Sequence, residues 1–426
     1  MILTDILEVI YAPQKVFKRI VANPKYLGVI LILLLFVGLQ LGYIFGQFSK
    51  IELEQTHPVG GIIQTFTNST SWTATSDVNI TNNLADYYNN TVFVANLQRP
   101  PNDPLGYYSL FGNFSLQLDV TDTKSFSVSL FNTSNVDCSG EGFKNLTLGL
   151  KLIQPKSAPQ NTTLTLYSLA DSNYFTYDLT SALADASVVN QWGEVVIPLG
   201  PDVKGWSETG NPQWNNITSL SLQFDYSNSQ DVTIRIGALF FGGLYMTPMQ
   251  YDSVGLLMRF LQVYALQFLF TWLFLTGLIY LICRGLKNTV LWKPLFIAMG
   301  FAMVVMVIRA VVSIAASAVL SVIYYPFDIS FGTIFDPLAM LYYPAEAVSS
   351  LLPQSQVSIV AIDAMLSVFS GIITIMFAVS YAWLGALGTF VIKELKPEFS
   401  TIKCAVIAAV SVCITLLLLW LLIGVV

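Results

Sequence analysis

Charged residues are scarce in this chain. Only 11% of its 426 residues are Asp, Glu, Lys or Arg, and 54% are hydrophobic, whereas a soluble protein carries about 25% charged residues. The single histidine, His57, excludes a metal site built from several histidines. Four cysteines are too few for a disulfide scaffold, and only Cys138 lies within residues 51–250. The composition therefore argues against a wholly cytosolic enzyme.

Sequence motifs of the common enzyme classes are missing too. The chain has no Gly-x-Ser-x-Gly, P-loop, His-Glu-x-x-His or Cys-x-x-Cys. No basic patch predicts nucleic-acid binding. Four aspartates could supply a calcium site, but their spacing is not diagnostic: Asp119, Asp122, Asp137 and Asp231. We therefore expect no enzymatic activity, no cofactor, no bound metal and no nucleic-acid partner.

The charges that are present divide the chain into two parts. Residues 51–250 hold 7 Lys and Arg against 17 Asp and Glu, whereas the remainder holds 13 against 9. The acidic part is also rich in Asn, Ser and Thr. The sequence therefore describes a polar insert within a very apolar chain.

Long apolar runs outside the insert predict helices that span a membrane, because about 20 apolar residues cross the hydrocarbon core. The runs lie at 25–46 and, within 254–426, at about 254–283, 294–323, 358–392 and 403–426. Residues 1–24 alternate apolar and basic positions and break at Ala12-Pro13, which predicts a short amphipathic helix on the cytosolic membrane surface. The sequence predicts five spans, and the lipid bilayer is the first partner.

Lys and Arg collect on one side of this predicted membrane. Ten of them precede the first span or lie between the second and third spans or the fourth and fifth: Lys15, Lys18, Arg19, Lys25, Arg284, Lys287, Lys293, Lys393, Lys396 and Lys403. The loop at about 324–357 has none. We expect a cytoplasmic N-terminus in a cell (plasma) membrane, with residues 51–250 and the C-terminus outside.

Small residues recur at every fourth position in the later spans and predict close packing of these helices. They are Ser313, Ser317 and Ser321 in the third span, Thr374, Ala378, Ala382 and Ala386 in the fourth, and Ala405 and Ala409 in the fifth. In an alternative interpretation, these seams bind neighbouring subunits instead of closing on one another.

Residues 51–250 show the period of two that is typical of half-buried strands. The pattern predicts a β-sandwich of about eight to ten strands, with its core at about 91–243. Eight Asn-x-Ser/Thr sequons lie in this insert, at Asn68, Asn79, Asn89, Asn113, Asn132, Asn145, Asn161 and Asn216. We expect N-glycosylation there. The alternative is that an Asn- and Thr-rich β-domain produces sequons by composition.

Three ionisable residues lie inside the predicted spans, where charge is costly. Arg309 and Asp363 fall at similar depths in the outer third of the membrane, so we predict that they form an ion pair. Arg259 lies near the outer end of the second span. The alternatives are a permeation or proton route and separate partners at the interface.

One stretch of the sequence carries a family resemblance. The pattern Tyr11–Ile20, followed by Pro24 and the first span, resembles the start of Yip-domain (Ypt/Rab-interacting) membrane proteins, and Tyr245–Pro248 is similar to prokaryotic members. The resemblance covers about 1–50 and 243–426 and implies five helices with the N-terminus inside. The large insert departs from the family pattern. The first 24 residues are too few for the family's GTPase-contacting region, so we do not expect its role in vesicle traffic.

A second stretch resembles galactose-binding-like jelly rolls, the fold of many carbohydrate-binding modules. It comprises Gln191–Leu199, Trp206, Trp214–Leu220 and Val232–Gly237. The resemblance implies that Trp206 and Trp214 form a platform on which a sugar stacks. Packing at the core or edge of the sandwich is the alternative. Gly237 stands where these folds often have Asp, so calcium and ligand contacts are not carried over.

Together these observations predict an α+β multi-domain membrane protein: a five-span helical bundle with an extracytoplasmic, jelly-roll-like β-sandwich inserted after the first span. Our first hypothesis is a non-enzymatic surface or envelope protein, in an archaeal cell membrane, that binds envelope glycans or another membrane or surface protein. The alternative is a transporter or channel component, or an accessory subunit of a membrane complex, with a polar site near Arg309 and Asp363.

Overall fold

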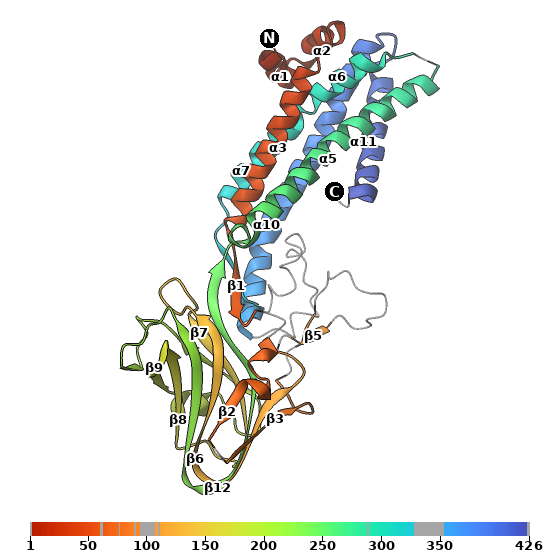
Figure 1. Ribbon diagram of the computed structural model, residues 1–426. Coiled ribbons are helices and arrows are strands. Elements are labelled where there is room, and N and C mark those ends of the chain that lie inside the picture. The colour runs from red at the N-terminus through yellow and green to blue at the C-terminus, as the bar shows by residue number, and fades with distance from the viewer. Residues whose placement is uncertain are drawn as a thin grey trace. The chain divides into compact units, whose positions relative to one another are not determined.

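The computed structural model describes residues 2–59, 63–75, 77–88, 91–93, 107–109, 111–287, 289–327 and 353–423. The side chains of residues 2, 91–93, 107–109, 132, 251, 353–366 and 423 lie outside the description. The chain forms a helical unit (Met1–Ile51, Thr247–Ile323 and Asp363–Val426) and a unit built mainly of strands (Glu52–Met246 and Tyr324–Ile362) (Figure 1). The predicted fold class is confirmed, because five long apolar helices accompany an antiparallel sandwich inserted after the first of them.

Five helical segments are long and apolar enough to cross a membrane. They belong to α3 (Leu27–Phe48), α5 (Pro248–Gly285), α6 with α7 (Trp292–Ala302 and Val304–Ala318), α10 (Pro353–Leu395) and α11 (Thr401–Ile423). Helix α3 packs against α5 and α7, and α11 packs against α5. The third segment differs from the expectation of one continuous helix, because a turn at Met303 separates α6 from α7.

Helix α5 begins where the sequence leaves the sandwich. The Thr247 hydroxyl accepts a hydrogen bond from the Gln250 backbone N–H at 3.3 Å, and the Gln250 side chain accepts one from the Thr247 N–H at 2.8 Å. Pro248 occupies the first helical position, where no N–H is needed. This capping box satisfies donors that the first turn leaves unpaired.

The N-terminal segment forms two short helices, α1 (Ile2–Tyr11) and α2 (Pro13–Ala22), which confirms the predicted break at Ala12-Pro13. Their apolar side chains do not all face lipid. Val9, Val16 and Phe17 are fully buried and join the core of the bundle. The expected surface helix is therefore docked on the bundle, and α2 contacts α6.

The small-residue seams were predicted only in part. Ser313 and Ser317 of α7 are buried, but Thr374, Ala378, Ala382 and Ala386 of α10 are exposed, as are Ala405 and Ala409 of α11. Helices α10 and α11 meet instead at Gly385, Gly388 and Ala408. A four-residue repeat marks one helix face, but it does not say which face the fold buries.

The sandwich is one continuous hydrogen-bonded sheet of eleven strands folded into two layers. Its strands are β1 (Ile51–His57), β2 (Trp72–Ala74), β3 (Val78–Asn83), β6 (Ser115–Val136), β7 (Asn145–Gln154), β8 (Asn161–Ser168), β9 (Ala170–Asp178), β10 (Gly193–Pro198), β11 (Trp206–Thr209), β12 (Ile217–Met246) and β13 (Ile323–Tyr325). A separate pair, β4 (Thr91–Phe93) and β5 (Tyr107–Ser109), stands outside this sheet.

Two long strands, β6 and β12, pass from one layer to the other. Their first and second halves pair with different neighbours, and the register shifts between Asp225 and Val232. At this corner Asp122 has a positive φ of 47°, and its N–H donates to the Asp231 carboxylate at 3.1 Å. One layer has six strands in the order β2–β6–β12–β8–β9–β11. The other layer has the order β3–β6–β12–β7–β10, and β1 pairs with the last part of β12.

Alternation along the strands fills the space between the layers. In β8, Leu164 and Leu166 are fully buried while Thr163 and Thr165 point outward and are half-buried. Each buried leucine of this kind contributes roughly 2 kcal/mol through loss of water contact. The predicted period of two is confirmed, and it leaves two outer faces of different chemistry.

Candidate functional site

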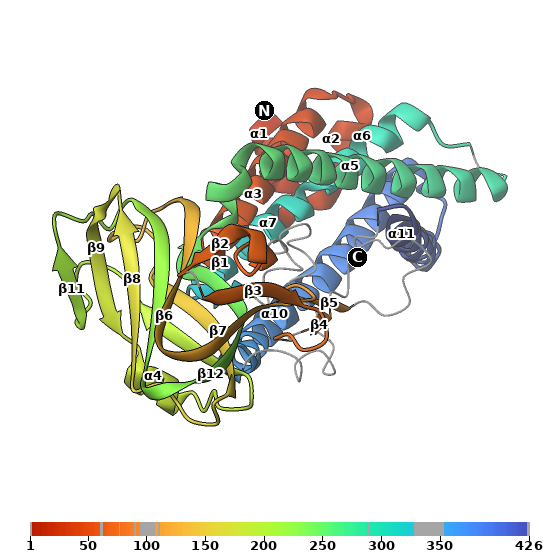
Figure 2. The ribbon, with the colours of Figure 1, turned by 60° about the horizontal axis from the view of Figure 1, so that its bottom comes forward.

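The outer side of the six-stranded layer carries mainly serine and threonine side chains, together with some aromatic, amide and carboxylate side chains. Ser219 and Ser221, at its centre, are buried. The strand registers place on it Thr73, Ser125, Ser127, Ser129, Phe131, Asn161, Thr163, Thr165, Tyr167, Tyr174, Thr176, Asp178, Ser207, Thr209, Ser219, Ser221, Gln223 and Asp225. We call this set the hydroxyl face. Figure 2 shows three of its strands, β8, β9 and β11, side by side. No Lys or Arg belongs to the set, so the face suits a neutral ligand better than an anion.

A carboxylate network lies at one end of the hydroxyl face. The Asp225 carboxylate accepts hydrogen bonds from Ser125 Oγ at 2.5 Å, Gln223 Nε2 at 3.0 Å and Asn161 Nδ2 at 3.1 Å. Burial alone raises the pKa of Asp225, but these hydrogen bonds outweigh it and lower the pKa. The carboxylate is therefore charged at neutral pH and keeps acceptor capacity for further donors.

Aromatic rings lie at the other end of the face. Phe131, Ser219 and Tyr167 are aligned across β6, β12 and β8, and Tyr174 follows on β9. The rings of Tyr167 and Tyr174 meet edge to face, with centroids 5.8 Å apart. Phe131 is 50% exposed, and both tyrosines are half-buried. Burial, with a smaller effect of Asp171, raises the pKa of Tyr167, which keeps its hydroxyl protonated as a donor.

This arrangement offers two kinds of contact across one surface. The tyrosines and Phe131 present ring faces or edges to the apolar side of a sugar ring. Ser, Thr, Asn and Gln side chains both donate and accept hydrogen bonds, and Asp225 accepts them. A polyhydroxylated, uncharged molecule matches both kinds of contact.

The outer side of the other layer is occupied by the chain itself. Asp86 accepts from Lys151 Nζ at 2.8 Å, from the Arg235 guanidinium, and from Trp192 Nε1 at 2.9 Å. Burial raises the pKa of Asp86, but the hydrogen bonds from Lys151 and Trp192 and the nearby charges lower it overall. The segment around Asp86 is thereby fastened across β7 and β12.

Gly237 explains how closely that segment lies. A Cβ at this position would stand 2.4 Å from the Cβ of Tyr88 and 3.0 Å from the Trp192 ring. Only glycine leaves that space. The departure from Asp noted in the sequence therefore has a packing cause.

The two tryptophans proposed as a sugar platform lie elsewhere. Trp214 is 8% exposed and stacks on Phe175, with centroids 4.0 Å apart. Trp206 is half-buried, and its indole N–H donates to the Pro198 carbonyl at 2.9 Å. Their rings meet edge to face at 5.2 Å. This burial favours the alternative of packing, and neither residue belongs to the hydroxyl face.

The intramembrane arginine is deeply buried. Arg309 on α7 is 7% exposed, and its guanidinium lies 5.5 Å from the centre of the Phe377 ring. It also interacts electrostatically with Tyr43, Tyr264 and Tyr381. The side chain of Asp363 lies outside the description, so the predicted ion pair stays a prediction. Arg259 is exposed on α5.

The predicted glycosylation sites differ in access. Asn79 and Asn113 are exposed, and Asn68, Asn145, Asn161 and Asn216 are half-buried. The amide nitrogen of Asn161, the atom that a glycan would modify, donates to Asp225. Asn89 and the side chain of Asn132 lie outside the described residues.

The single histidine packs inside the sandwich unit. His57 Nε2 lies 2.6 Å from the Thr133 carbonyl oxygen, and since a carbonyl only accepts, this nitrogen carries the proton. The rings of Phe66, Phe143 and Phe241 surround it. Across the described ranges, no three His, Cys, Asp or Glu side chains gather as a metal site.

The fold defines a multi-pass membrane protein that carries a β-sandwich. Neither a family model nor a curated protein matches the sequence. The resemblance to Yip-domain proteins therefore finds no support in these comparisons.

Among solved structures, the chain is similar to a family 11 carbohydrate-binding module from Clostridium thermocellum in complex with a beta-1,3-1,4-mixed-linked tetrasaccharide, at 12% identity and a TM-score of 0.26, over 45% of this chain and 95% of that one. It is also similar to the CBM22-1 xylan-binding domain from Paenibacillus barcinonensis, at 12% identity and a TM-score of 0.21, over 41% and 88%.

Proposed function

We propose that this protein is a non-enzymatic membrane protein whose β-sandwich binds a neutral glycan on the hydroxyl face. The observation that carries the proposal is the pairing of an aromatic end, Tyr167 with Tyr174, and a carboxylate end at Asp225 across a surface of serines and threonines. The opposite outer face is covered by the segment around Asp86. Among the described residues, the hydroxyl face is therefore the outer face that is better suited to a ligand.

The sandwich would be displayed outside the cell. The support is the clustering of ten Lys and Arg at one side of the five spans, since such clusters mark the cytoplasmic side. Outside placement makes the sequons available for glycosylation. Envelope glycans of an archaeal cell, or a glycosylated surface protein, are the ligands that we propose. A Yip-like ancestry of the bundle stays a proposal that rests on Tyr11–Ile20 and the number of spans.

The test is binding of the full-length protein, in lipid nanodiscs, to a glycan array that includes glycans released from cell envelopes. We expect retention of a defined set of neutral glycans. Tyr174→Ala and Asp225→Asn should each weaken binding several-fold, because they remove a ring face and a charged acceptor respectively.

Tyr324→Ala is the matched control. Tyr324 is a 53% exposed tyrosine of the same unit, and it does not belong to the hydroxyl face. Equal losses in all three variants, or a folded protein that retains no glycan, would contradict the proposal.

A second candidate is transport across the bundle, which the burial of Arg309 favours. Helix α5 also buries polar side chains, and within the described side chains its Gln267 Oε1 has no hydrogen-bond partner. Buried charge and unpaired polar atoms in a span are typical of substrate or ion pathways. Solute flux into proteoliposomes that Arg309→Gln abolishes would support this function. Flux that is absent, or unchanged by the variant, would refute it.

A further inference from the structure

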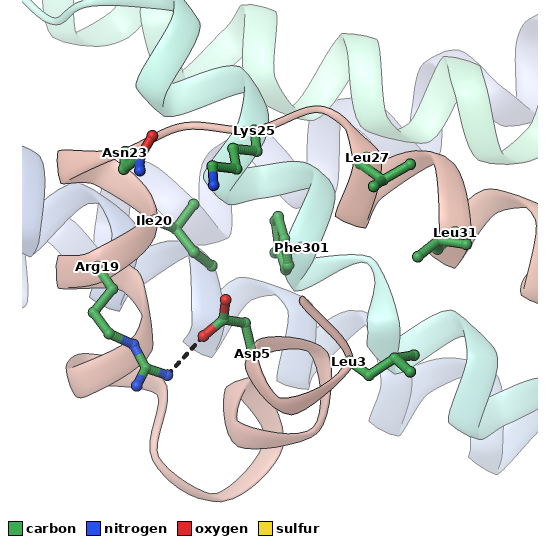
Figure 3. Close-up of a pocket in the computed structure, with 9 residues that line it drawn as sticks. All are labelled: Leu3, Asp5, Arg19, Ile20, Asn23, Lys25, Leu27, Leu31 and Phe301. Atoms are coloured by element: carbon green, nitrogen blue, oxygen red, sulfur yellow. Dashed lines mark hydrogen bonds and ion pairs between the residues drawn. The ribbon is translucent and has the colours of Figure 1, made fainter. Parts of the chain in front are cut away.

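The helical unit contains a pocket of about 550 Å³ at the start of α3. Its lining comes from α1, α2, α3 and α6 and the link before α3: Leu3, Asp5, Arg19, Ile20, Asn23, Lys25, Leu27, Leu31 and Phe301 (Figure 3). The volume lies in the range of sites for small molecules, roughly 300–1,000 Å³. None of these residues belongs to the hydroxyl face.

One wall of the pocket is apolar and continues along the membrane-spanning helix. Leu27 and Leu31 lie one turn apart on α3 and are exposed. Behind them Phe301 is 3% exposed, and its ring occupies the space left by Gly28, where a Cβ would lie 2.0 Å from the ring. The wall is therefore fixed by packing on the Phe301 side, and Leu27 and Leu31 leave its other side open.

The polar side of the pocket has one cation without an ionic partner. Arg19 Nη2 lies 2.7 Å from Asp5 Oδ1 and also pairs with Glu8, so two carboxylates face its one positive charge. Lys25 points into the pocket in Figure 3. It is exposed, and in the described part of the chain its ammonium group makes no ion pair or hydrogen bond. An anion at this place would therefore meet the ammonium of Lys25, which has no carboxylate of its own.

We propose that this pocket binds an anionic phospholipid, with its phosphate at Lys25 and Asn23 and an acyl chain along Leu27 and Leu31. Bases at the end of a span attract anionic lipid headgroups, and the adjoining apolar wall matches the chain that such a headgroup carries. A free phosphate would leave this wall exposed to water. The lipid thus satisfies both halves of the pocket.

The experiment measures lipid binding to the purified full-length protein by native mass spectrometry. Phosphatidylglycerol and phosphatidylcholine with identical acyl chains are the probes. We expect tighter binding of phosphatidylglycerol, and Lys25→Gln should weaken it about fivefold, the effect of one base near an anionic surface. Lys25→Arg should restore it. Lys18→Gln removes an equal charge from an exposed position of α2 outside the pocket, and should leave binding within about twofold.

Three results would overturn the proposal. The first is equal affinity for the two lipids, and the second is an equal loss in Lys18→Gln and Lys25→Gln, which would indicate diffuse attraction. The third is displacement of phosphatidylglycerol by millimolar inorganic phosphate, which would make the free anion the occupant. An unchanged thermal unfolding midpoint of Lys25→Gln separates loss of the site from loss of the fold.

Discussion

Asp86 is the residue whose replacement tests the sandwich most sharply. Its carboxylate connects the segment around Asp86 to Lys151, Arg235 and Trp192, which are 65, 149 and 106 residues away in sequence. Asp86→Asn keeps the shape of the side chain but removes its charge. Lys151 and Arg235 would then remain half-buried without a carboxylate.

The expected loss follows from the burial of the partners. The side chains of Asp86, Lys151 and Arg235 are 29%, 18% and 17% exposed, so each ion pair is worth nearer 1 kcal/mol than the 3–5 kcal/mol of a fully buried pair. Two pairs give a loss of about 2 kcal/mol. For a unit of about 230 residues this lowers the unfolding midpoint by about 4–8 °C.

The assay is thermal unfolding of the full-length protein, followed by tryptophan fluorescence because four of its eight tryptophans, Trp192 among them, lie in the sandwich unit. Asp77→Asn is the control, since Asp77 is exposed and makes no ion pair among the described residues. If the unfolding midpoint of Asp86→Asn falls no further than that of Asp77→Asn, the ion pairs of Asp86 do not contribute to the stability of the sandwich.

Three further predictions follow from the same unit. Hydrogen bonds lower the pKa of Asp86 and Asp225 below the usual 3.8 despite burial, so the stabilisation from these carboxylates is fully present above that value and is lost as the pH falls through the lowered pKa. The unfolding midpoint should therefore change little from about pH 7 to 5 and decrease below about pH 4. A steep loss near pH 6 would contradict this assignment. Gly237→Ala should lower the free energy of unfolding by about 1–3 kcal/mol, because the added methyl group overpacks against Tyr88. Gly140→Ala, with no atom within 4 Å of its Cβ, should be nearly neutral. Equal thermal unfolding midpoints for the two variants would refute the packing argument. Glycopeptide mass spectrometry of the native protein should find Asn79 and Asn113 occupied more fully than Asn161, whose amide is hydrogen-bonded, and the reverse order would be evidence against this ranking.

Local periodicity predicted the elements well. The spans and the strands around Leu146–Leu150 and Leu164–Leu166 were found because apolar spacing reports burial within one element. The break at Ala12-Pro13 followed from the missing N–H of proline. The turn at Met303 carries no proline, and the sequence did not predict it.

The candidate site was harder to predict because its residues meet only through strand pairing. Ser125 and Asp225 are 100 residues apart in sequence and come together only when β6 pairs with β12. One signal was available: the outward positions Thr163, Thr165 and Tyr167 alternate with buried leucines, so a hydroxyl face was readable on β8. Trp206 and Trp214 were predicted as a platform because tryptophan rings stack on sugars, but large aromatic rings also fill cores.

The most direct test of the account is the affinity of the full-length protein for its best array glycan, compared with that of a Tyr167→Ala/Tyr174→Ala variant. Two lost aromatic contacts, each worth about 0.5–1.5 kcal/mol, predict a weakening of roughly tenfold or more, with the Tyr324→Ala control unchanged. Binding by the double variant that equals the wild type would show that the glycan does not bind on the hydroxyl face.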